Sequence, residues 1–262
     1  MDVLSPRTLG EALQMKAERP GAVPIQGGTD VMVDLNFDRG RPTALLNLNE
    51  VAELRGWSRE NGRIWLGSGL TYTEAMQPPL SDLLPALAEA SRTVGGPQIR
   101  NRGTIGGNLG TASPAGDAIP PLLVAGADVK LVSLRSERVV RLEEFLVGPK
   151  RNVLAEDELI AGVSVAPADS RETFMKVGPR NAMVISVVSL ALAVDGDEVR
   201  ASFGSAGPVA GLVSAPLAER EGFADRVAAA ASSIDDVRGT AAYRRHALRV
   251  LTERALDRCL AA

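Results

Sequence analysis

The spacing of apolar residues along this chain changes repeatedly between helical and strand periods, which predicts a mixed α and β protein. After Thr8, apolar residues recur three and four positions apart until Pro20, and Thr8 with Glu11 has the spacing of a capping box. Short runs rich in Val, Leu and Ile predict strands at 22–26, 43–48, 63–69, 127–134, 137–142 and 158–165. Between them, helices are predicted at 9–19, 49–56, 81–95 and 117–126.

Around 166–172 the composition turns to Pro, Asp and Ser, which predicts a linker and a domain boundary. Beyond it the chain offers strands again, with "DGDE" at 195–198 as a two-residue hairpin turn. The predicted elements of this last part are strands at 173–178, 184–194 and 198–207, followed by helices at 223–234 and 240–260.

The composition suits a chain with a buried core, since 45% of its 262 residues are hydrophobic. Its 29 basic residues are scattered among 32 acidic ones, so no broad basic field favours nucleic acid. No run approaches the roughly 20 apolar residues of a membrane-spanning helix, and the first residues lack a basic start followed by an apolar stretch. We therefore expect a cytoplasmic protein with no membrane span.

One cysteine and one histidine limit the chemistry that the chain can perform alone. Cys259 and His246 cannot supply the ligands of a zinc or iron–sulfur site, and neither a Ser-His-Asp nor a Cys-His set can be assembled. His246 lies in a charged helical stretch, where a solvated helix residue is a better interpretation than a catalytic base. If the chain takes part in chemistry, we expect a cofactor to carry it.

The stretch 93–117 concentrates seven of the 26 glycines. Glycine pairs at 27–28 and 106–107 let backbone amides converge and let a ligand approach without meeting a Cβ, which is the design of an anion-binding nest. We expect Gly107 to have a positive φ. Two such loops suit a pyrophosphate, although a Gly-Gly pair alone is more often a plain turn. Neither loop matches the P-loop or the Rossmann pattern.

Three stretches together resemble a known family: "IQGGTDVMVDL", "VGGPQIRNRGTIGGNLGTASPAGDAIPPLLVAGADVKL" and "FMKVGPR". They are similar to the FAD-binding, or medium, subunit of the molybdenum hydroxylases, the xanthine dehydrogenase and carbon monoxide dehydrogenase family. The resemblance covers nearly the whole chain. It implies an α+β fold with a two-subdomain FAD-binding domain of the vanillyl-alcohol oxidase and p-cresol methylhydroxylase type, at 1–167 with subdomains of about 1–54 and 55–167. A smaller α+β domain of antiparallel strands and helices follows at 170–262.

The resemblance also implies which residues contact the FAD, position by position. The first pyrophosphate loop would comprise Ile25, Gln26, Gly27, Gly28, Thr29, Asp30 and Val31. The second would comprise Thr104, Ile105, Gly106, Gly107 and Asn108. Further contacts would come from Val94, where some relatives place an aromatic residue near the flavin ring, and from Asp117, Ile160 and Lys176.

Some residues keep more than one interpretation. Asp117 could contact the cofactor, cap the helix predicted after it, or do both. Arg100 and Arg102 could hold the cofactor's anionic end or a partner's surface, or could only keep the loop solvated. Many relatives carry an Asp at the place of Val184. Because an acidic group near a flavin alters its reduction potential, the absence of this Asp leaves both the potential and the final electron acceptor open.

The family resemblance implies an FAD-carrying electron-transfer subunit of a molybdenum-containing dehydrogenase. It would take electrons from a partner's [2Fe–2S] clusters and pass them to NAD, a quinone or oxygen, while a large molybdopterin subunit oxidises the substrate. We expect a dimer of heterotrimers. The FAD should be noncovalent, because neither His246 nor Cys259 lies near the glycine loops. The alternatives are a self-contained flavin oxidase of a small organic substrate and a non-enzymatic nucleotide-binding protein.

Overall fold

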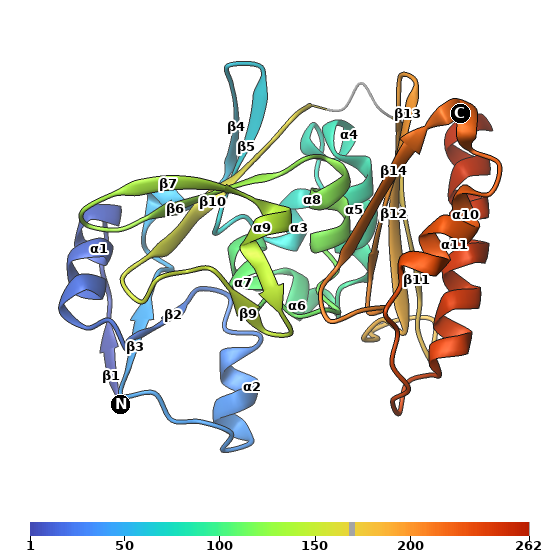
Figure 1. Cartoon of the computed structure of the whole chain (residues 1–262). Helices are drawn as coiled ribbons and strands as arrows, with labels where there is room; N and C mark the ends of the chain where they lie inside the picture. Colours follow the sequence, from blue (N-terminus) through green and yellow to red (C-terminus); the bar gives the residue numbers. More distant parts are fainter. Residues whose placement is uncertain (168–170, 262) are drawn as a thin grey trace.

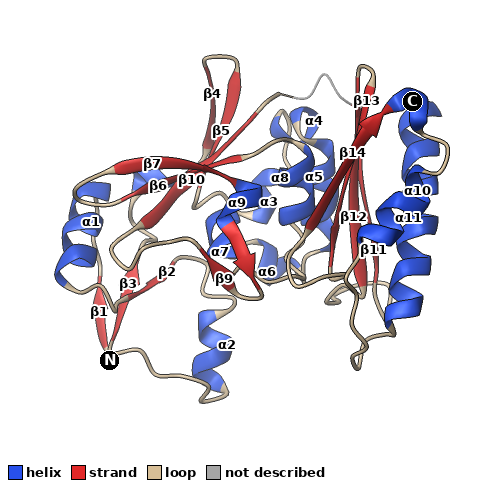
Figure 2. Cartoon of the chain, viewed as in Figure 1, coloured by secondary structure: helices blue, strands red, loops and turns tan. Residues whose placement is uncertain are grey.

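The computed structural model describes residues 1–167 and 171–261. The expected linker at 166–172 therefore lies partly outside the described residues. Three larger sheets and the two-stranded pair β8-β9 make up the strands of the described residues, and helices pack between and against the larger sheets (Figures 1 and 2). The mixed α and β content agrees with the expectation from the sequence.

The first sheet is parallel and holds three short strands in the order β1-β3-β2. The run predicted at 43–48 forms the central strand, which pairs with β1 on one edge and with β2 on the other. Its residues are almost all buried. The elements of this part are β1 (Asp2–Leu4), α1 (Leu9–Glu18), β2 (Val23–Ile25), α2 (Val31–Asn36), β3 (Ala44–Asn47) and η1 (Ala52–Leu54). Thr8 caps α1 by accepting the Glu11 N–H, as its spacing predicted.

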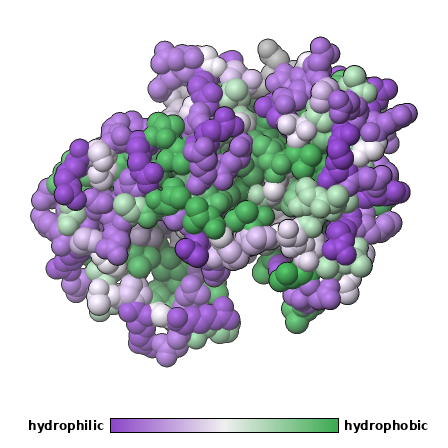
Figure 3. Space-filling view, viewed as in Figure 1, coloured by the Kyte–Doolittle hydropathy of each residue, from purple (hydrophilic) through white to green (hydrophobic). Residues whose placement is uncertain are grey.

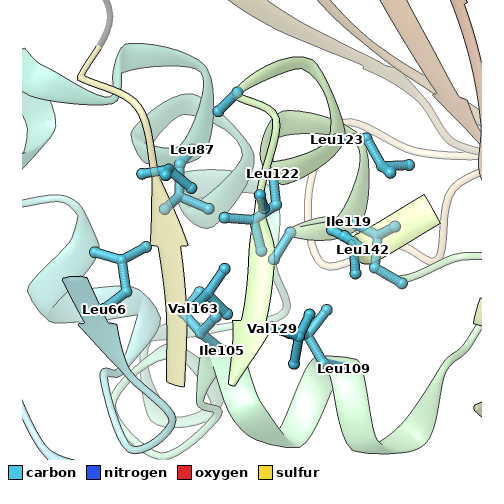
Figure 4. Packing of buried hydrophobic residues seen from close by; sticks show 14 of the residues in the cluster. Leu66, Leu87, Ile105, Leu109, Ile119, Leu122, Leu123, Val129, Leu142 and Val163 are labelled. Atoms are coloured by element: carbon cyan, nitrogen blue, oxygen red, sulfur yellow. The ribbon is translucent and has the colours of Figure 1, made fainter. Parts of the chain in front are cut away.

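The second sheet is antiparallel, with the order β4-β5-β10-β6-β7. Its strands are β4 (Trp57–Glu60), β5 (Arg63–Gly67), β6 (Asp128–Val132), β7 (Glu137–Arg141) and β10 (Leu159–Val165). Short elements join them: α3 (Tyr72–Ala75), α4 (Leu80–Leu83), α5 (Pro85–Thr93), α6 (Pro97–Arg100), α7 (Ile105–Thr111), α8 (Ile119–Val124), α9 (Leu142–Phe145), β8 (Leu146–Gly148) and β9 (Arg151–Asn152). Side chains from this sheet and from α5, α7 and α8 share one core (Figure 4).

The single helix expected at 81–95 is wrong. The chain forms two helices instead, because Pro85 excludes the preceding Leu84 from helical backbone angles. Leu84 has φ −136° and ψ 66°, and Pro85 opens α5 at its first position.

The third sheet is antiparallel in the order β11-β12-β13-β14, with β11 (Arg171–Val177), β12 (Val188–Asp195), β13 (Glu198–Gly204) and β14 (Gly211–Pro216). The expected hairpin turn at 195–198 is present. Helices α10 (Phe223–Ala230) and α11 (Ala241–Ala261) cover one face of this sheet, while α5 and α8 lie on the other (Figure 1). A short 3-10 turn, η2 (Leu217–Glu219), precedes α10.

A carboxylate on α5 ties this third sheet to the middle of the chain. Glu89 accepts hydrogen bonds from the Thr173 hydroxyl and the Phe174 N–H on β11, at 2.9 and 2.8 Å, and pairs with Arg258 on α11. Beneath it, Phe174 packs into a small apolar cluster shared by α5, α8, β11 and β12. The sheet is therefore attached to the helices beside it by a partly exposed polar contact and by a buried apolar one.

A buried arginine anchors the segment that leads into β12. Arg244 is 1% exposed, and its Nη1 donates to the carbonyls of Val187 and Ser205, while its Nη2 pairs with Asp236. Hydrogen bonds from Arg238, together with the charge of Arg244, hold the pKa of Asp236 at about 2, below its ordinary value of 3.8. Asp236 therefore stabilises the fold as long as it is ionised.

We predict that Asp236→Asn lowers the free energy of unfolding by about 2 kcal/mol at pH 7, because it leaves the buried Arg244 guanidinium without its counter-charge. Since the folded-state pKa is depressed, this contribution is present above pH 3.8 and is lost as the pH falls toward 2. Urea unfolding at several pH values measures it. Asp195→Asn, which removes an exposed ion pair with Arg200, should cost under about 0.5 kcal/mol. An equal loss for both variants contradicts the role given to Asp236.

Candidate functional site

A cavity of about 460 Å³ lies where the first sheet meets the helices of the middle region. Its walls come from the end of β2, the start of α2, the first turns of α7, the 113–117 loop and β10. In the view of Figure 1, the space-filling representation shows hydrophobic residues gathered near the centre and polar ones on both flanks (Figure 3). The cavity is thus built from segments far apart in the sequence, which include both glycine pairs.

The first loop presents a row of backbone donors. The N–H groups of Gly27, Gly28, Thr29, Asp30 and Val31 donate to no acceptor in the described part of the chain. All five residues line the cavity. Gly28 has φ 72°, a conformation that favours glycine. Unpaired backbone donors that line a cavity can converge on an anion, so this loop is suited to an anionic ligand.

Arg102 positions this loop. Its Nη2 donates to the Gln26 carbonyl and to Asn49 Oδ1, both at 3.1 Å. Gly27 lies so close to the Arg102 carbonyl that a Cβ there would be 2.2 Å from the oxygen. The two glycine-rich segments therefore touch through backbone atoms, and Arg102 joins them rather than standing free in solvent.

The second glycine pair lies in the first turn of a helix. Thr104 caps α7 by accepting the Gly107 N–H at 3.0 Å, and the Gly106 N–H donates to the Ser68 carbonyl at 2.8 Å. The expectation of a positive φ at Gly107 is wrong, because Gly107 has entered the helix. Gly106 is needed for close packing on Ser68, whereas Gly107 has open space at its Cβ except for Thr104 Oγ1 at 3.0 Å.

Four buried polar atoms around the cavity have no hydrogen-bond partner among the described residues: Gln26 Nε2, Ser68 Oγ, Asn108 Oδ1 and Asp117 Oδ1. Buried polar groups are almost always paired, so unpaired ones that share a cavity indicate a ligand with both donors and acceptors. Together with the free amides, they fit a cofactor that carries phosphates, hydroxyl groups and a polar ring system.

A buried ion pair closes the wall at 113–117. Lys176 on β11 donates to Asp117 Oδ2 at 2.5 Å, and both side chains are less than a tenth exposed. Burial raises the pKa of Asp117, and Lys176 opposes that effect. Asp117 does not cap the helix after it, because α8 is preceded by Ala118 and has no side-chain cap. Burial and the nearby Asp117 also raise the pKa of Tyr72, so its phenol stays neutral.

All the residues expected to contact the cofactor line this cavity except Ile105 and Lys176. The Ile105 side chain is fully buried in the core near Leu66 and Val163 (Figure 4). Lys176 reaches the cavity only through Asp117. Ser68 and Tyr72 line the cavity but were not anticipated; the only sequence signal was the "GSG" at 67–69 after a predicted strand.

Neither His246 nor Cys259 belongs to the site, since both lie on α11 and do not line the cavity. Among residues 1–167 and 171–261, no group of His, Cys, Asp and Glu side chains could hold a metal ion. Within the same residues no helix is long and apolar enough to cross a membrane.

A family model described as the FAD binding domain in molybdopterin dehydrogenase matches residues 1–168. The chain belongs to this family. It is 34% identical over 206 residues to the nicotinate dehydrogenase FAD-subunit of Eubacterium barkeri, covering 75% of this chain and 69% of that protein. It is 32% identical over 211 residues to the xanthine dehydrogenase FAD-binding subunit of Escherichia coli O157:H7, covering 77% and 72%.

Solved structures agree on the fold. Carbon monoxide dehydrogenase from Hydrogenophaga pseudoflava superposes with a TM-score of 0.91 at 23% identity, over 100% of this chain and 97% of that one. Quinoline 2-oxidoreductase from Pseudomonas putida 86 gives 0.90 at 21%, over 99% and 96%. The chain is an FAD-binding subunit of the molybdenum hydroxylase family, an oxidoreductase component, as the resemblance of its sequence to that family implied.

We predict that Lys176→Met lowers the free energy of unfolding of the flavin-free chain by about 3 kcal/mol at pH 7, because Asp117 is left buried without a counter-charge. Without Lys176 the folded-state pKa of Asp117 rises further, so the loss is smallest near the ordinary value of 3.8 and grows as the pH increases. Urea unfolding of the single variants and of Asp117→Asn with Lys176→Met measures this, and the double variant should recover part of the loss. A loss independent of pH refutes the assignment.

Proposed function

We propose that this chain holds FAD in the cavity between its two glycine loops and acts as the electron-transfer subunit of a molybdenum-containing dehydrogenase. In this proposal it takes electrons from [2Fe–2S] clusters of a partner subunit and passes them to an external acceptor. The observation that supports it best is the row of unpaired N–H groups from Gly27 to Val31, which faces the cavity beside four unpaired buried polar atoms.

We assign different residues of the cavity lining to different parts of the FAD dinucleotide. The amides of Gly27–Val31 and the open surface at Gly107 would receive the pyrophosphate, where no Cβ obstructs its approach. Val94 and Asp117 line the part of the cavity next to the third sheet and would lie near the flavin ring. FAD itself supplies the redox chemistry, whereas the chain orients it and keeps water from part of it.

The described residues offer no constellation for substrate oxidation. They contain no metal-binding group, and the single His246 lies on α11 away from the cavity. The named relatives act on nicotinate and on xanthine, each as one subunit of its enzyme. We therefore assign the hydroxylation to a molybdopterin subunit and electron delivery to an iron–sulfur subunit, in a dimer of heterotrimers.

The domain division inferred from the sequence remains part of this proposal: an FAD-binding domain at 1–167, with subdomains of about 1–54 and 55–167 and the vanillyl-alcohol oxidase type of architecture, followed by 170–262. The third sheet has an apolar core of its own with α10 and α11, which supports a boundary before it, while the core around the first sheet also includes residues of β6 and β10.

We predict that Gly107→Val lowers FAD occupancy at least tenfold, since the valine branches would occupy the open space where a phosphate approaches, and a 1.4 kcal/mol loss already gives a factor of ten. The backbone there is helical, so the fold should tolerate the change. Flavin absorbance per chain and the melting temperature are measured on one sample. Gly10→Val, at another helical glycine with open space, is the matched control and should keep its flavin. Loss of stability with unchanged flavin would refute the role of Gly107 in ligand access.

We predict that the flavin-loaded chain alone is not reduced by any substrate of the whole complex, because no residue set in it performs that oxidation. The purified chain is mixed anaerobically with a purine, nicotinate, an aldehyde or carbon monoxide while the oxidised flavin absorbance is followed.

The flavin should be bound noncovalently, so acid treatment of the chain should release it into solution as FAD.

Two outcomes separate the candidate functions. Bleaching only after iron–sulfur and molybdenum subunits are added supports the electron-transfer role. Bleaching by one of the substrates without partners refutes that role and supports a self-contained oxidase.

A further inference from the structure

Tyr72 is the one aromatic residue among the described residues that line the cavity. It opens α3, is 5% exposed, and belongs to the apolar core shared by the second sheet and α7. The chain's only other tyrosine, Tyr243, lies on α11 and is 48% exposed. The binding of phosphates by backbone amides leaves Tyr72 without a role in the cavity.

The backbone of Tyr72 is fixed to the second glycine-rich segment. The Tyr72 N–H donates to the Gly103 carbonyl at 3.1 Å, and Thr71 forms a β-bridge with Thr104. On the other side, a capping box between Thr71 and Glu74 holds the first turn of α3. The chain makes these contacts by itself, so the position of Tyr72 is set before a ligand binds.

The ring of Tyr72 packs against the backbone of Gly103. A Cβ at Gly103 would lie 3.0 Å from Cε2 of the ring, which is closer than a Cβ ordinarily approaches, so glycine favours this contact. The Ile99 side chain lies against Gly95, the residue after Val94. Tyr72, Val94 and Ile99 all line the cavity, so it offers one aromatic ring together with aliphatic side chains. Such a lining suits a flat aromatic ligand.

The Tyr72 hydroxyl is a donor without an acceptor. No hydrogen bond joins it to another described residue, and burial, with a smaller effect from the charge of Asp117, raises the pKa of Tyr72, so the hydroxyl keeps its proton. Asp117 Oδ1 is unpaired as well, so the two groups are not bonded to each other. Because the hydroxyl of a buried tyrosine usually has a partner, this one is available to a ligand in the cavity.

The neighbours of Tyr72 place it at the flavin end of the cavity. In the function proposed above, the amides of residues 27–31 receive the pyrophosphate, whereas Val94 and Asp117 lie near the flavin ring. Tyr72 is close enough to Asp117 for the charge of that carboxylate to act on its phenol. An aromatic ring and a neutral donor are of little use to a phosphate, but both match the flat, carbonyl-bearing isoalloxazine.

We propose that Tyr72 is a flavin-binding residue, whose ring contacts the isoalloxazine and whose hydroxyl donates a hydrogen bond to a carbonyl oxygen of that ring system. The proposal rests on FAD occupying the cavity, as proposed above. Reduction increases the electron density on the flavin carbonyls, and a hydrogen bond becomes stronger as its acceptor becomes more negative. Tyr72 should therefore hold reduced FAD more tightly than oxidised FAD, and so raise the reduction potential of the bound flavin.

Tyr72→Phe removes the hydroxyl and keeps the ring. We expect it to weaken the binding of oxidised FAD about fivefold, which is the effect of one neutral hydrogen bond, and to weaken that of reduced FAD by more. The reduction potential should therefore fall, as measured by dithionite titration beside a reference dye. A phenol in contact with an excited flavin quenches its fluorescence by electron transfer, whereas a benzene ring does not, so the fluorescence of the bound flavin should rise.

ADP and the second tyrosine provide the matched controls. ADP carries the adenosine and the phosphates of FAD but no flavin, so its dissociation constant should differ by less than about twofold between the wild-type chain and Tyr72→Phe. Tyr243→Phe, on α11 and outside the cavity, should change neither the FAD affinity, the reduction potential nor the fluorescence. The melting temperature of each sample shows whether the fold is retained.

A second measurement keeps the phenol in place. Fluorotyrosine incorporated into the Tyr243→Phe chain labels Tyr72 alone, because the chain has two tyrosines. Fluorine NMR should show a larger shift of this signal with FAD than with ADP, since only FAD brings an aromatic ring to Tyr72.

The outcomes separate this proposal from its alternatives. An unchanged reduction potential and fluorescence in Tyr72→Phe overturn it and leave Tyr72 as a residue of the core. Equal losses of ADP and FAD affinity also overturn it, because the substitution then acts on the glycine-rich segment. Equal fluorine shifts with the two ligands overturn it even where Tyr72→Phe does not fold. A wild-type chain that binds neither ligand refutes the proposed function itself, and this is seen before any variant is compared.

Discussion

The buried ion pair between Asp117 and Lys176 is the contact on which the cavity wall at residues 113–117 depends. Asp117 ends the glycine-rich stretch of the middle region, and Lys176 comes from the first strand of the third sheet. Two buried charges attract each other strongly but are costly to remove from water, so such a pair is stable only where the surrounding fold fixes both partners. Here a second contact helps, since the Ser205 N–H donates to the Pro114 carbonyl at 2.7 Å. The third sheet thereby shapes the wall of the FAD cavity.

Close backbone contacts explain why glycine is needed in these loops. A Cβ at Gly27 would collide with the Arg102 carbonyl, and a Cβ at Gly106 would lie 2.4 Å from Ser68 Cβ. At these two positions glycine allows separate segments to touch. Gly107 is different, because its space is open toward the cavity. One glycine pair therefore serves both packing and ligand access, and the two roles belong to different members of the pair.

The sequence predicted the elements with strong periodicity and the residues of the glycine loops, but it could not predict how they meet. The strands at 43–48 and 158–165 and the long C-terminal helix follow from local apolar patterns. Strand β14 was not predicted, because its residues Gly211–Pro216 are only partly buried and lack alternation. Ser68 was missed for another reason: its role depends on the approach of α7, which is a tertiary contact. Ile105 shows the converse, since a residue inside a binding motif can point into the core.

The first cavity presents its donors in a form that suits the retention of a cofactor. Its lining includes three carboxylates, of which Asp117 is neutralised by Lys176 and Glu158 by Arg138. The third, Asp30, lies on the loop whose backbone amides line the cavity, and those amides are fixed by the fold. Preorganised, neutral donors cost little to desolvate and need no side-chain ordering. A cofactor that stays bound benefits from such donors, because the fold has already supplied the order that binding requires.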